Sequence, residues 1–257
     1  MAEALEVHQF PCLSDNYGVL VHASDSGQTA SIDAADAGAV QSALAERGWQ
    51  LSHILTTHHH ADHTDGNNAL KAATGCTIVG PKGEAERIPG IDIALGEGDT
   101  YDFAGHSVRV IETPGHTAGH ISYHFGDAGL AFVGDTLFAL GCGRLFERSA
   151  ETMWDSLSKL IALPGDTVVY CGHEYTLANA EFALTIEPEN AALQARAEEI
   201  RATRGRGEPT LPTTMALELE TNPFLRPASP AIRARLAMPD NPDWEVFAEI
   251  RKRKDNA

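Results

Sequence analysis

The sequence predicts an α/β domain that is followed by a smaller helical domain. Short β-type runs alternate with helical segments as far as about residue 173, and this alternation is typical of α/β proteins. Beyond that point the chain reads as helices that are interrupted by prolines. A chain of 257 residues is long enough to bury a core in both parts. We therefore expect one domain at residues 1–173 and a second at residues 174–257.

The α/β part begins with three β-type runs separated by turn-forming residues, namely residues 5–10, 17–23 and 29–34. A helix is expected next, because Asp36 can cap its N-terminus and Gly48 can end it. Further strands are expected at residues 51–57, 106–113, 120–125, 129–135 and 166–172. Two more helices are expected at residues 66–75 and 149–166, and the second has its apolar residues on one face. The C-terminal part contains four predicted helices, at residues 176–186, 188–203, 213–220 and 242–254.

The composition excludes several classes of protein. The formal charge of −17 argues against a nucleic-acid partner, which would require a basic surface. No apolar run is long enough for a transmembrane helix, and the first residues lack the features of a signal peptide. The four cysteines are isolated from one another in the sequence, so we expect neither a disulfide framework nor a thiolate zinc site. We therefore expect a protein of the reducing cytoplasm without a membrane partner. A monomer is also expected, although the sequence does not determine the oligomeric state.

A cluster of histidines and aspartates follows the β-type run that ends at residue 57. His58 and His60 are two residues apart, so in an extended chain they project to the same side and can bind one metal ion. After a turn, Asp62 and His63 can bind a second ion. Two ligands do not hold a catalytic metal ion, which usually has three or more protein ligands. The cluster therefore predicts only part of a metal site.

The missing ligands should lie where other strands end, because functional residues gather on loops that a rigid scaffold holds. Three metal-binding residues each follow an apolar run and a glycine, namely His116, Asp135 and His173. A single histidine after a strand is usually structural. The recurrence of the pattern, with the histidine cluster first, indicates a metal centre.

The ligands are sufficient for two divalent ions. The first ion would bind His58, His60 and His116, and the second ion would bind Asp62, His63 and His173. Asp135 would bridge the ions, because a carboxylate can bridge and an imidazole normally cannot. The donors suit Zn²⁺, which we expect, as well as iron or Mn²⁺. A bridging hydroxide would balance the remaining positive charge at neutral pH.

The segment "THHHADH" matches the THxHxDH motif of the metallo-β-lactamase-fold hydrolases, and the later ligands follow in that family's order. The segments "TPGHTAGH", "FVGDTLF", "GCGRLFE", "CGHEYTLAN" and "RKRKD" also resemble those of glyoxalase II, or hydroxyacylglutathione hydrolase. This resemblance extends over essentially the whole chain. It implies a four-layer αββα sandwich with the metal ions at one edge, followed by a helical C-terminal domain.

The resemblance also implies a reaction, the hydrolysis of S-D-lactoylglutathione to glutathione and D-lactate in methylglyoxal detoxification. A metal-bridging hydroxide would attack the thioester carbonyl, and Asp62 would orient it as well as bind the second ion. The leaving group is a thiolate whose parent pKa is about 8.5, so a general acid is not required. The substrate contacts of the family correspond here to Arg144, Phe146, Tyr175, Arg251 and Lys254.

Two of these positions differ from the pattern of many eukaryotic members, which have Lys in place of Arg144 and Tyr in place of Phe146. Arginine keeps the positive charge, but a phenylalanine cannot donate a hydrogen bond. We therefore expect Phe146 to contribute packing and to affect substrate affinity rather than chemistry. The basic tail from Arg251 onward can end a helix favourably, and it also matches the two carboxylates of glutathione.

Several other residues receive structural interpretations. His59 should point away from the metal ions, and His120 should lie in the core or beside a ligand. His53 is interpreted as structural. Cys142 and Cys171 lie near the predicted site in sequence, but we interpret them as small buried residues.

Other functions on the same scaffold have specific arguments against them. A glutathione persulfide dioxygenase would use one iron held by two histidines and one aspartate, and the cationic C-terminal tail favours the hydrolase. A β-lactamase generally lacks part of the Asp-His pair and such a tail. A nuclease of the RNase Z type is disfavoured by the charge of −17. A non-catalytic metal-binding protein would be expected to have lost ligands, and all seven are present.

Overall fold

The computed structural model describes residues 4–257. The chain forms two compact units. The first comprises Met1–Glu112 and Thr117–Gly134, and the second comprises Thr113–His116 and Asp135–Ala257. The domain boundary that we expect after residue 173 stays a prediction. Within the described residues, none of the helices combines the length and the apolar character that a membrane crossing needs.

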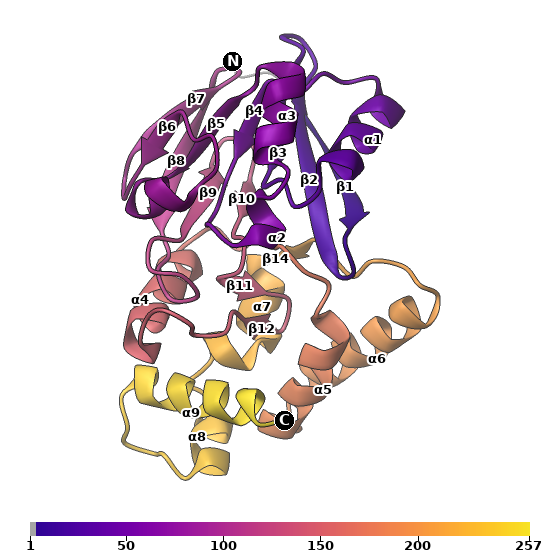
Figure 1. Ribbon diagram of the computed structural model, residues 1–257. Helices are drawn as coiled ribbons and strands as arrows, with labels where there is room; N and C mark the ends of the chain where they lie inside the picture. Colours follow the sequence, from indigo (N-terminus) through magenta and orange to yellow (C-terminus); the bar gives the residue numbers. More distant parts are fainter. Residues whose placement is uncertain (1–3) are drawn as a thin grey trace. The chain divides into compact units, whose positions relative to one another are not determined.

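A six-stranded sheet forms the centre of the first unit (Figure 1). Its strands follow the chain in spatial order: β1 (Leu5–Cys12), β2 (Asn16–Ala23), β3 (Gln28–Ile32), β4 (His53–Leu55), β5 (Thr77–Pro81) and β6 (Ile93–Leu95). The first three strands pair antiparallel, and β3 to β6 pair parallel. Parallel neighbours need crossover connections. Helices α1 (Ala37–Arg47) and α3 (Asn67–Thr74) provide two of them.

Both crossover helices pack on the same sheet. Val40 of α1 and Leu70 of α3 belong to one buried apolar cluster with Leu20, Ile54 and Ile78 of the strands. Asp36 caps α1 by accepting a hydrogen bond from the amide of Ala39, and Gly48 ends it in the left-handed conformation, as the sequence predicts. The first unit also contains the short helices α2 (Ala61–Thr64) and η1 (Lys82–Arg87).

Four further strands of the first unit form an antiparallel arrangement in the order β10-β9-β8-β7. Their bounds are β7 (Thr100–Phe103), β8 (His106–Glu112), β9 (Ile121–Phe125) and β10 (Leu130–Phe132). Tyr123 of β9 is buried, and its hydroxyl donates a hydrogen bond to the carbonyl of Thr56. The β9 side chains thus pack on the residues that follow β4.

The sequence pattern did not indicate strands β5, β6 and β7. Each has three to five residues. Such runs are too short to display a clear alternation of apolar and polar side chains. β5 also contains a glycine and a proline, two residues that strands usually lack.

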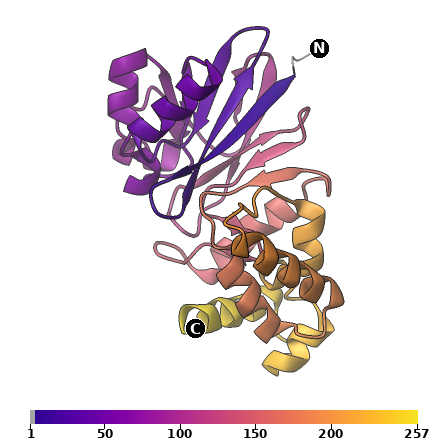
Figure 2. The same cartoon turned by 90° about the vertical axis from the view of Figure 1, so that its right-hand side faces the viewer.

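The second unit is mainly helical (Figure 2). Its helices are α4 (Ala150–Ile161), α5 (Thr176–Ile186), α6 (Ala191–Gly205), α7 (Met215–Thr221), η2 (Pro223–Leu225), α8 (Pro230–Leu236) and α9 (Asp243–Asp255). A short hairpin precedes them, formed by β11 (Leu137–Phe138) and β12 (Gly141–Cys142). The region that we predicted to be wholly helical also contains one short strand, β14 (Thr213–Thr214), which pairs with β13 (Val168–Tyr170).

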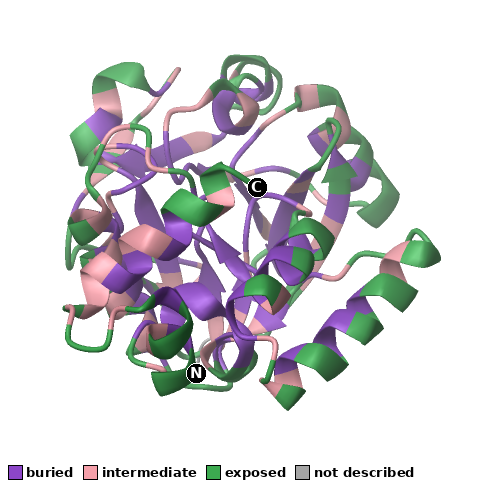
Figure 3. Cartoon of the chain, turned by 90° about the horizontal axis from the view of Figure 1, so that it is seen from below, coloured by how far each residue is buried: buried purple, intermediate pink, exposed green. Residues whose placement is uncertain are grey.

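The helices of the second unit are amphipathic, and Figure 3 shows buried and exposed residues alternating along them. In α6, Leu193, Ala197 and Ile200 are buried, while the residues between them are mostly exposed. Leu140, in the tip of the β11–β12 hairpin, joins these residues in one apolar cluster with Ala180 of α5. The hairpin is therefore anchored in the helical core of its own unit.

Candidate metal centre and pocket

Residues 58–63, which contain four of the predicted metal ligands, follow β4, as the sequence predicts. The Nε2 atom of His58 and the Nδ1 atom of His60 face each other at 3.1 Å. The rings of His58 and His63 have their centroids 4.1 Å apart. Asp62 Oδ2 lies 3.6 Å from His63 Nε2. All four predicted ligands of this loop are thus gathered within the first unit.

Asp33 orients two of these histidines. Its carboxylate accepts hydrogen bonds from the amide and the hydroxyl of Thr57, at 2.7 and 2.9 Å, and from His63 Nδ1 at 2.8 Å. Because the Thr57 hydroxyl donates to Asp33, it can accept the proton of His58 Nδ1, which lies 3.0 Å away. Both rings then carry their proton on Nδ1 and present Nε2 as the atom for a metal ion. Asp33 directly follows β3, but it lies inside the β-type run predicted at residues 29–34 and was not predicted to belong to the site.

Three further residues of the first unit contact the segment at residues 58–63 and help to hold its side chains. Asn16 donates hydrogen bonds from its side chain to both the backbone carbonyl and the carboxylate of Asp62. Glu84 accepts from the amide of His59 and lies 2.7 Å from its Nδ1. The ring of His120 is buried and stacks on that of His58 at 4.9 Å. His120 is thus the neighbour of a predicted ligand, as expected, whereas the interpretation of His59 as a non-ligand stays a prediction.

His53 also has a structural environment. Its ring meets those of Tyr101 and Phe103 edge to face, and burial lowers its pKa. His53 is therefore a packed imidazole whose neutral form is favoured, which agrees with a structural role.

The second unit gathers the other three predicted ligands. The Oδ2 atom of Asp135 lies 3.4 Å from His116 Nε2 and 3.3 Å from His173 Nε2. All three side chains are buried. His116 Nδ1 donates a hydrogen bond to the carbonyl of Arg144 at 2.9 Å, so its Nε2 is directed toward Asp135. An aspartate between two imidazoles is a suitable environment for a divalent ion.

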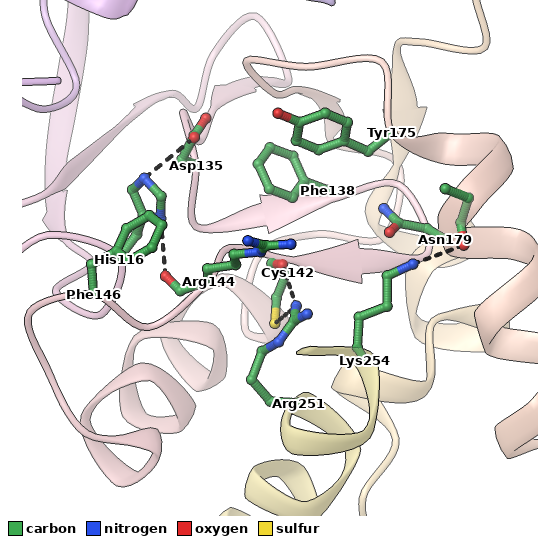
Figure 4. Close-up of a pocket in the computed structure, with 11 residues that line it drawn as sticks. His116, Asp135, Phe138, Cys142, Arg144, Phe146, Tyr175, Asn179, Arg251 and Lys254 are labelled. Carbon is green, nitrogen blue, oxygen red and sulfur yellow. Dashed lines mark hydrogen bonds and ion pairs between the residues drawn. The ribbon is translucent and has the colours of Figure 1, made fainter. Parts of the chain in front are cut away.

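A cavity of about 450 Å³ opens beside Asp135 within the second unit (Figure 4). The five residues that the sequence analysis assigns to substrate binding all line it: Arg144, Phe146, Tyr175, Arg251 and Lys254. His116 and Asp135 line it as well. Figure 4 shows these two residues at one end and Lys254 at the other. The cavity therefore extends from predicted metal ligands to a group of cations.

The cations are held by specific contacts. Arg251 is buried, donates a hydrogen bond to the carbonyl of Cys142 at 2.9 Å, and pairs with Asp255. Its guanidinium also lies over the ring of Phe224. Lys254 donates to the carbonyl of Ala178 at 2.9 Å. These contacts fix the direction of both side chains.

The electrostatics of the cavity favour an anion. Burial, followed by the charges of Arg251 and Arg144, lowers the pKa of Lys254. Burial is the larger cause, and the two arginines add to it because their positive charges crowd the protonated ammonium. An anionic ligand would relieve this crowding, on a protein whose net charge is otherwise −17.

Two aromatic residues form part of the cavity wall. Tyr175 stacks on His173 at 4.7 Å between ring centroids. Phe146 is 63% exposed, and its ring lies 5.1 Å from that of His116. Both rings are accessible and lie next to predicted metal ligands, so each can contact a bound molecule.

The cysteines near the site are buried thiols. Burial raises the pKa of Cys142 to about 11 and that of Cys171 to about 12. Both groups are therefore protonated near neutral pH, whereas nucleophilic or metal-binding cysteines act as thiolates. This agrees with their interpretation as small buried residues.

The donors are suitable for transition-metal ions. Neutral imidazoles and carboxylates bind Zn²⁺, Fe and Mn²⁺, and the hydrogen bonds to Asp33 and Arg144 direct the Nε2 atoms of His63 and His116. The chemistry of the donors does not select one of these metals.

Comparison with known proteins identifies the scaffold. Residues 19–173 match the metallo-beta-lactamase superfamily, and residues 174–257 match the hydroxyacylglutathione hydrolase C-terminus. The chain is 62% identical to a hydroxyacylglutathione hydrolase of Rhizobium meliloti, over 98% of this chain and 99% of the relative. It is also 60% identical to a hydroxyacylglutathione hydrolase of Brucella anthropi, over 99% of this chain and 98% of the relative.

A solved structure agrees on the fold. The BLEG-1 B3 metallo-beta-lactamase has a TM-score of 0.66 and 21% sequence identity, and the match covers 86% of this chain and 100% of that one. The predicted fold class, a metallo-β-lactamase sandwich with a helical C-terminal domain, is confirmed.

Proposed function

Because the chain belongs to the hydroxyacylglutathione hydrolase family of the metallo-β-lactamase superfamily, we propose that it hydrolyses the thioester of S-(2-hydroxyacyl)glutathione. The expected substrate is S-D-lactoylglutathione, and the products are glutathione and D-lactate. Identity of about 60% to named hydrolases, over the whole chain, carries this proposal. The cationic cavity beside Asp135 supports it, because glutathione is a peptide with two carboxylates.

The proposed metal centre would hold two divalent ions; Zn²⁺ is the metal that we expect, and iron or Mn²⁺ would suit the same donors. The first ion would bind His58, His60 and His116, the second would bind Asp62, His63 and His173, and Asp135 would be shared. When bound, such ions polarise the thioester carbonyl and make water a nucleophile at neutral pH. Asp33 and the Arg144 carbonyl keep the ligating Nε2 atoms in position.

Asp62 has a second proposed role in the attack of water. Asn16 holds its carboxylate through Oδ2 at 3.2 Å. A carboxylate so oriented can accept a hydrogen bond from the attacking water and direct its lone pair toward the carbonyl carbon. Substitution of Asn16 would therefore affect the chemical step through Asp62.

No protein acid is needed for the leaving group. Breaking the thioester releases the glutathione thiolate, whose parent thiol has a pKa of about 8.5. It can depart as an anion near neutral pH. Five residues that line the cavity would bind the peptide. Arg144, Arg251 and Lys254 would pair with its carboxylates. Tyr175 would offer its hydroxyl, and Phe146 would pack against it.

The direct test is to incubate metal-loaded protein with S-D-lactoylglutathione and to follow the loss of thioester absorbance. Hydrolysis with release of one free thiol for each thioester consumed is the expected result. Oxygen uptake with glutathione persulfide and no hydrolysis would instead establish a persulfide dioxygenase, the alternative with the most similar substrate. The absence of both reactions in metal-loaded protein would favour a non-catalytic metal-binding protein.

We further propose that the protein acts as a monomer in the cytoplasm. The four cysteines are all free and buried, as is usual in a reducing compartment. Light scattering of the purified protein would measure its mass, and the chain mass of 27.5 kDa is the expected value.

A further inference from the structure

A buried carboxylate lies behind the wall of the cavity and has no place in the mechanism described above. Glu218 of α7 is fully buried and does not line the cavity. Its Oε1 accepts hydrogen bonds from Arg196 at 2.5 Å and from Thr213 at 2.7 Å. Its Oε2 accepts from the backbone amide of Leu140 at 2.8 Å and from the Asn222 side chain at 2.9 Å. Four donors thus converge on one buried carboxylate.

Two of these contacts concern the β11–β12 hairpin. Leu140 in its tip has a φ of 57°, a left-handed conformation that is unfavourable for leucine. Glu218 holds the Leu140 amide, and the Asn222 side chain donates to the carbonyls of Phe138 and Gly141. Such a backbone conformation persists only where the surroundings enforce it. Glu218 and Asn222 help to enforce the Leu140 conformation through their hydrogen bonds to the hairpin backbone.

The hairpin in turn arranges the cavity. The carbonyl of Cys142, its last residue, accepts the hydrogen bond that directs Arg251. The ring of Phe138 meets that of Tyr175 edge to face at 5.3 Å. Arg144 follows two residues after the hairpin and also lines the cavity. A displaced hairpin would therefore misplace several groups that are proposed to bind glutathione.

We propose that Glu218 is a positioning residue for substrate binding. It holds the β11–β12 hairpin in the conformation that presents Arg251 and Tyr175 to the glutathione moiety. This inference rests on the proposed function. Glu218 would thus increase the affinity for glutathione by holding the hairpin, in addition to stabilising the folded protein.

The same unit offers a matched control, Glu187. This carboxylate is also buried, and it accepts hydrogen bonds from Arg226, Ser229 and Asn190. None of these partners belongs to the hairpin or lines the cavity. Substituting Glu187 therefore disrupts another ion pair of a buried carboxylate, in this case with the partly exposed Arg226, without acting on the hairpin.

The experiment compares Glu218→Gln with Glu187→Gln. A glutamine offers one acceptor oxygen and one donor amide, so it cannot serve Arg196 and Leu140 together. Both variants should unfold at a lower temperature than the wild type. Only Glu218→Gln should raise KM for S-D-lactoylglutathione and Kd for glutathione, each by roughly tenfold, with kcat per bound metal changed by less than about threefold. Equal KM values in the two variants would overturn the proposal.

Asn222→Ala is the milder second variant, for use where Glu218→Gln does not fold. It leaves Glu218 and Arg196 paired but removes the bonds to the Phe138 and Gly141 carbonyls. KM should again rise, and an unchanged KM would contradict the role of the hairpin. If the wild type hydrolyses the thioester and no variant alters KM, this proposal alone fails. If the wild type is inactive, the proposed function fails and the role of Glu218 falls with it.

Discussion

Arg251 and Lys254 present the same chemistry, a cation at the wall of the cavity, through different contacts. Arg251 is buried and fixed by Cys142 and Asp255, whereas Lys254 is partly exposed and directed by the Ala178 carbonyl. Neither residue lies among the predicted metal ligands. Both should therefore act on the remote peptide part of the substrate rather than on the thioester.

The first prediction concerns the affinity that these cations provide. Arg251→Ala and Lys254→Ala should each raise KM about tenfold or more, with a smaller change in kcat, because binding lost at a remote site weakens the ground state and the transition state alike. Steady-state kinetics with S-D-lactoylglutathione measures both constants. Lys252→Ala is the control, since Lys252 is exposed on the same helix and does not line the cavity. A fall in kcat alone would assign these residues a different role.

The second prediction follows from the lowered pKa of Lys254. Its ammonium binds a carboxylate only while it is protonated, so affinity is lost as the pH rises through this pKa. Burial and the neighbouring arginines lower the pKa below the ordinary 10.5. KM should therefore begin to rise at a lower pH than an ordinary lysine would allow. Lys254→Arg, which stays charged, should remove this rise, and identical pH profiles for both proteins would exclude Lys254 as the titrating group.

At the scale of elements, the longer helices were predictable, whereas strands β5, β6, β7, β11, β12 and β14 were not. The helix predicted at residues 176–186 coincides with α5, and the cap and stop of α1 are those expected. Helices of this length span about three turns, which is enough for caps, stops and a run of helix-forming residues to be recognised. By contrast, β11 and β12 have two residues each, yet Phe138 and Cys142 from these strands line the cavity. Their position depends on Glu218 and Asn222, which lie about 80 residues away in sequence.

The third prediction concerns Gly143, directly after this hairpin. A Cβ atom at Gly143 would lie 1.9 Å from the backbone carbonyl oxygen of Asp135, a contact that only backbone movement can relieve. Gly143→Ala should therefore displace Asp135 and reduce both bound metal and activity by at least about tenfold. Metal analysis of the purified variant measures the first effect. Gly205→Ala, where the added Cβ meets nothing within 4 Å, should retain full metal content.

At the scale of the whole molecule, the proposed ligands are distributed over both compact units. The first unit contributes four of them and the second contributes three. Within each unit, hydrogen bonds already orient the proposed ligands. His63 donates to the Asp33 carboxylate in the first unit, and His116 donates to the Arg144 carbonyl in the second. If these residues are the ligands, side chains held in this way would need little rearrangement within each unit to bind a metal ion.

The fourth prediction concerns removal of the metal. Protein purified without chelators should contain two metal ions per chain, and chelation should abolish hydrolysis. The unfolding temperature should also fall, because an ion that binds only the folded state at 100 times its Kd stabilises that state by about 2.7 kcal/mol. Calorimetry before chelation, after chelation and after addition of Zn²⁺ measures this shift. One ion per chain, with full activity, would contradict the proposed binuclear centre.

The sequence by itself determined the types and order of the proposed ligands, the main helices and the resemblance to one family. These features are local, since a histidine pair, a helix cap or a short motif can be recognised within a few residues. Only the tertiary structure decided which residues support the site. Asp33, Glu84 and Glu218 act through partners 24 to 78 residues away. A sequence pattern does not reveal such contacts, because chain folding rather than spacing brings the two partners together.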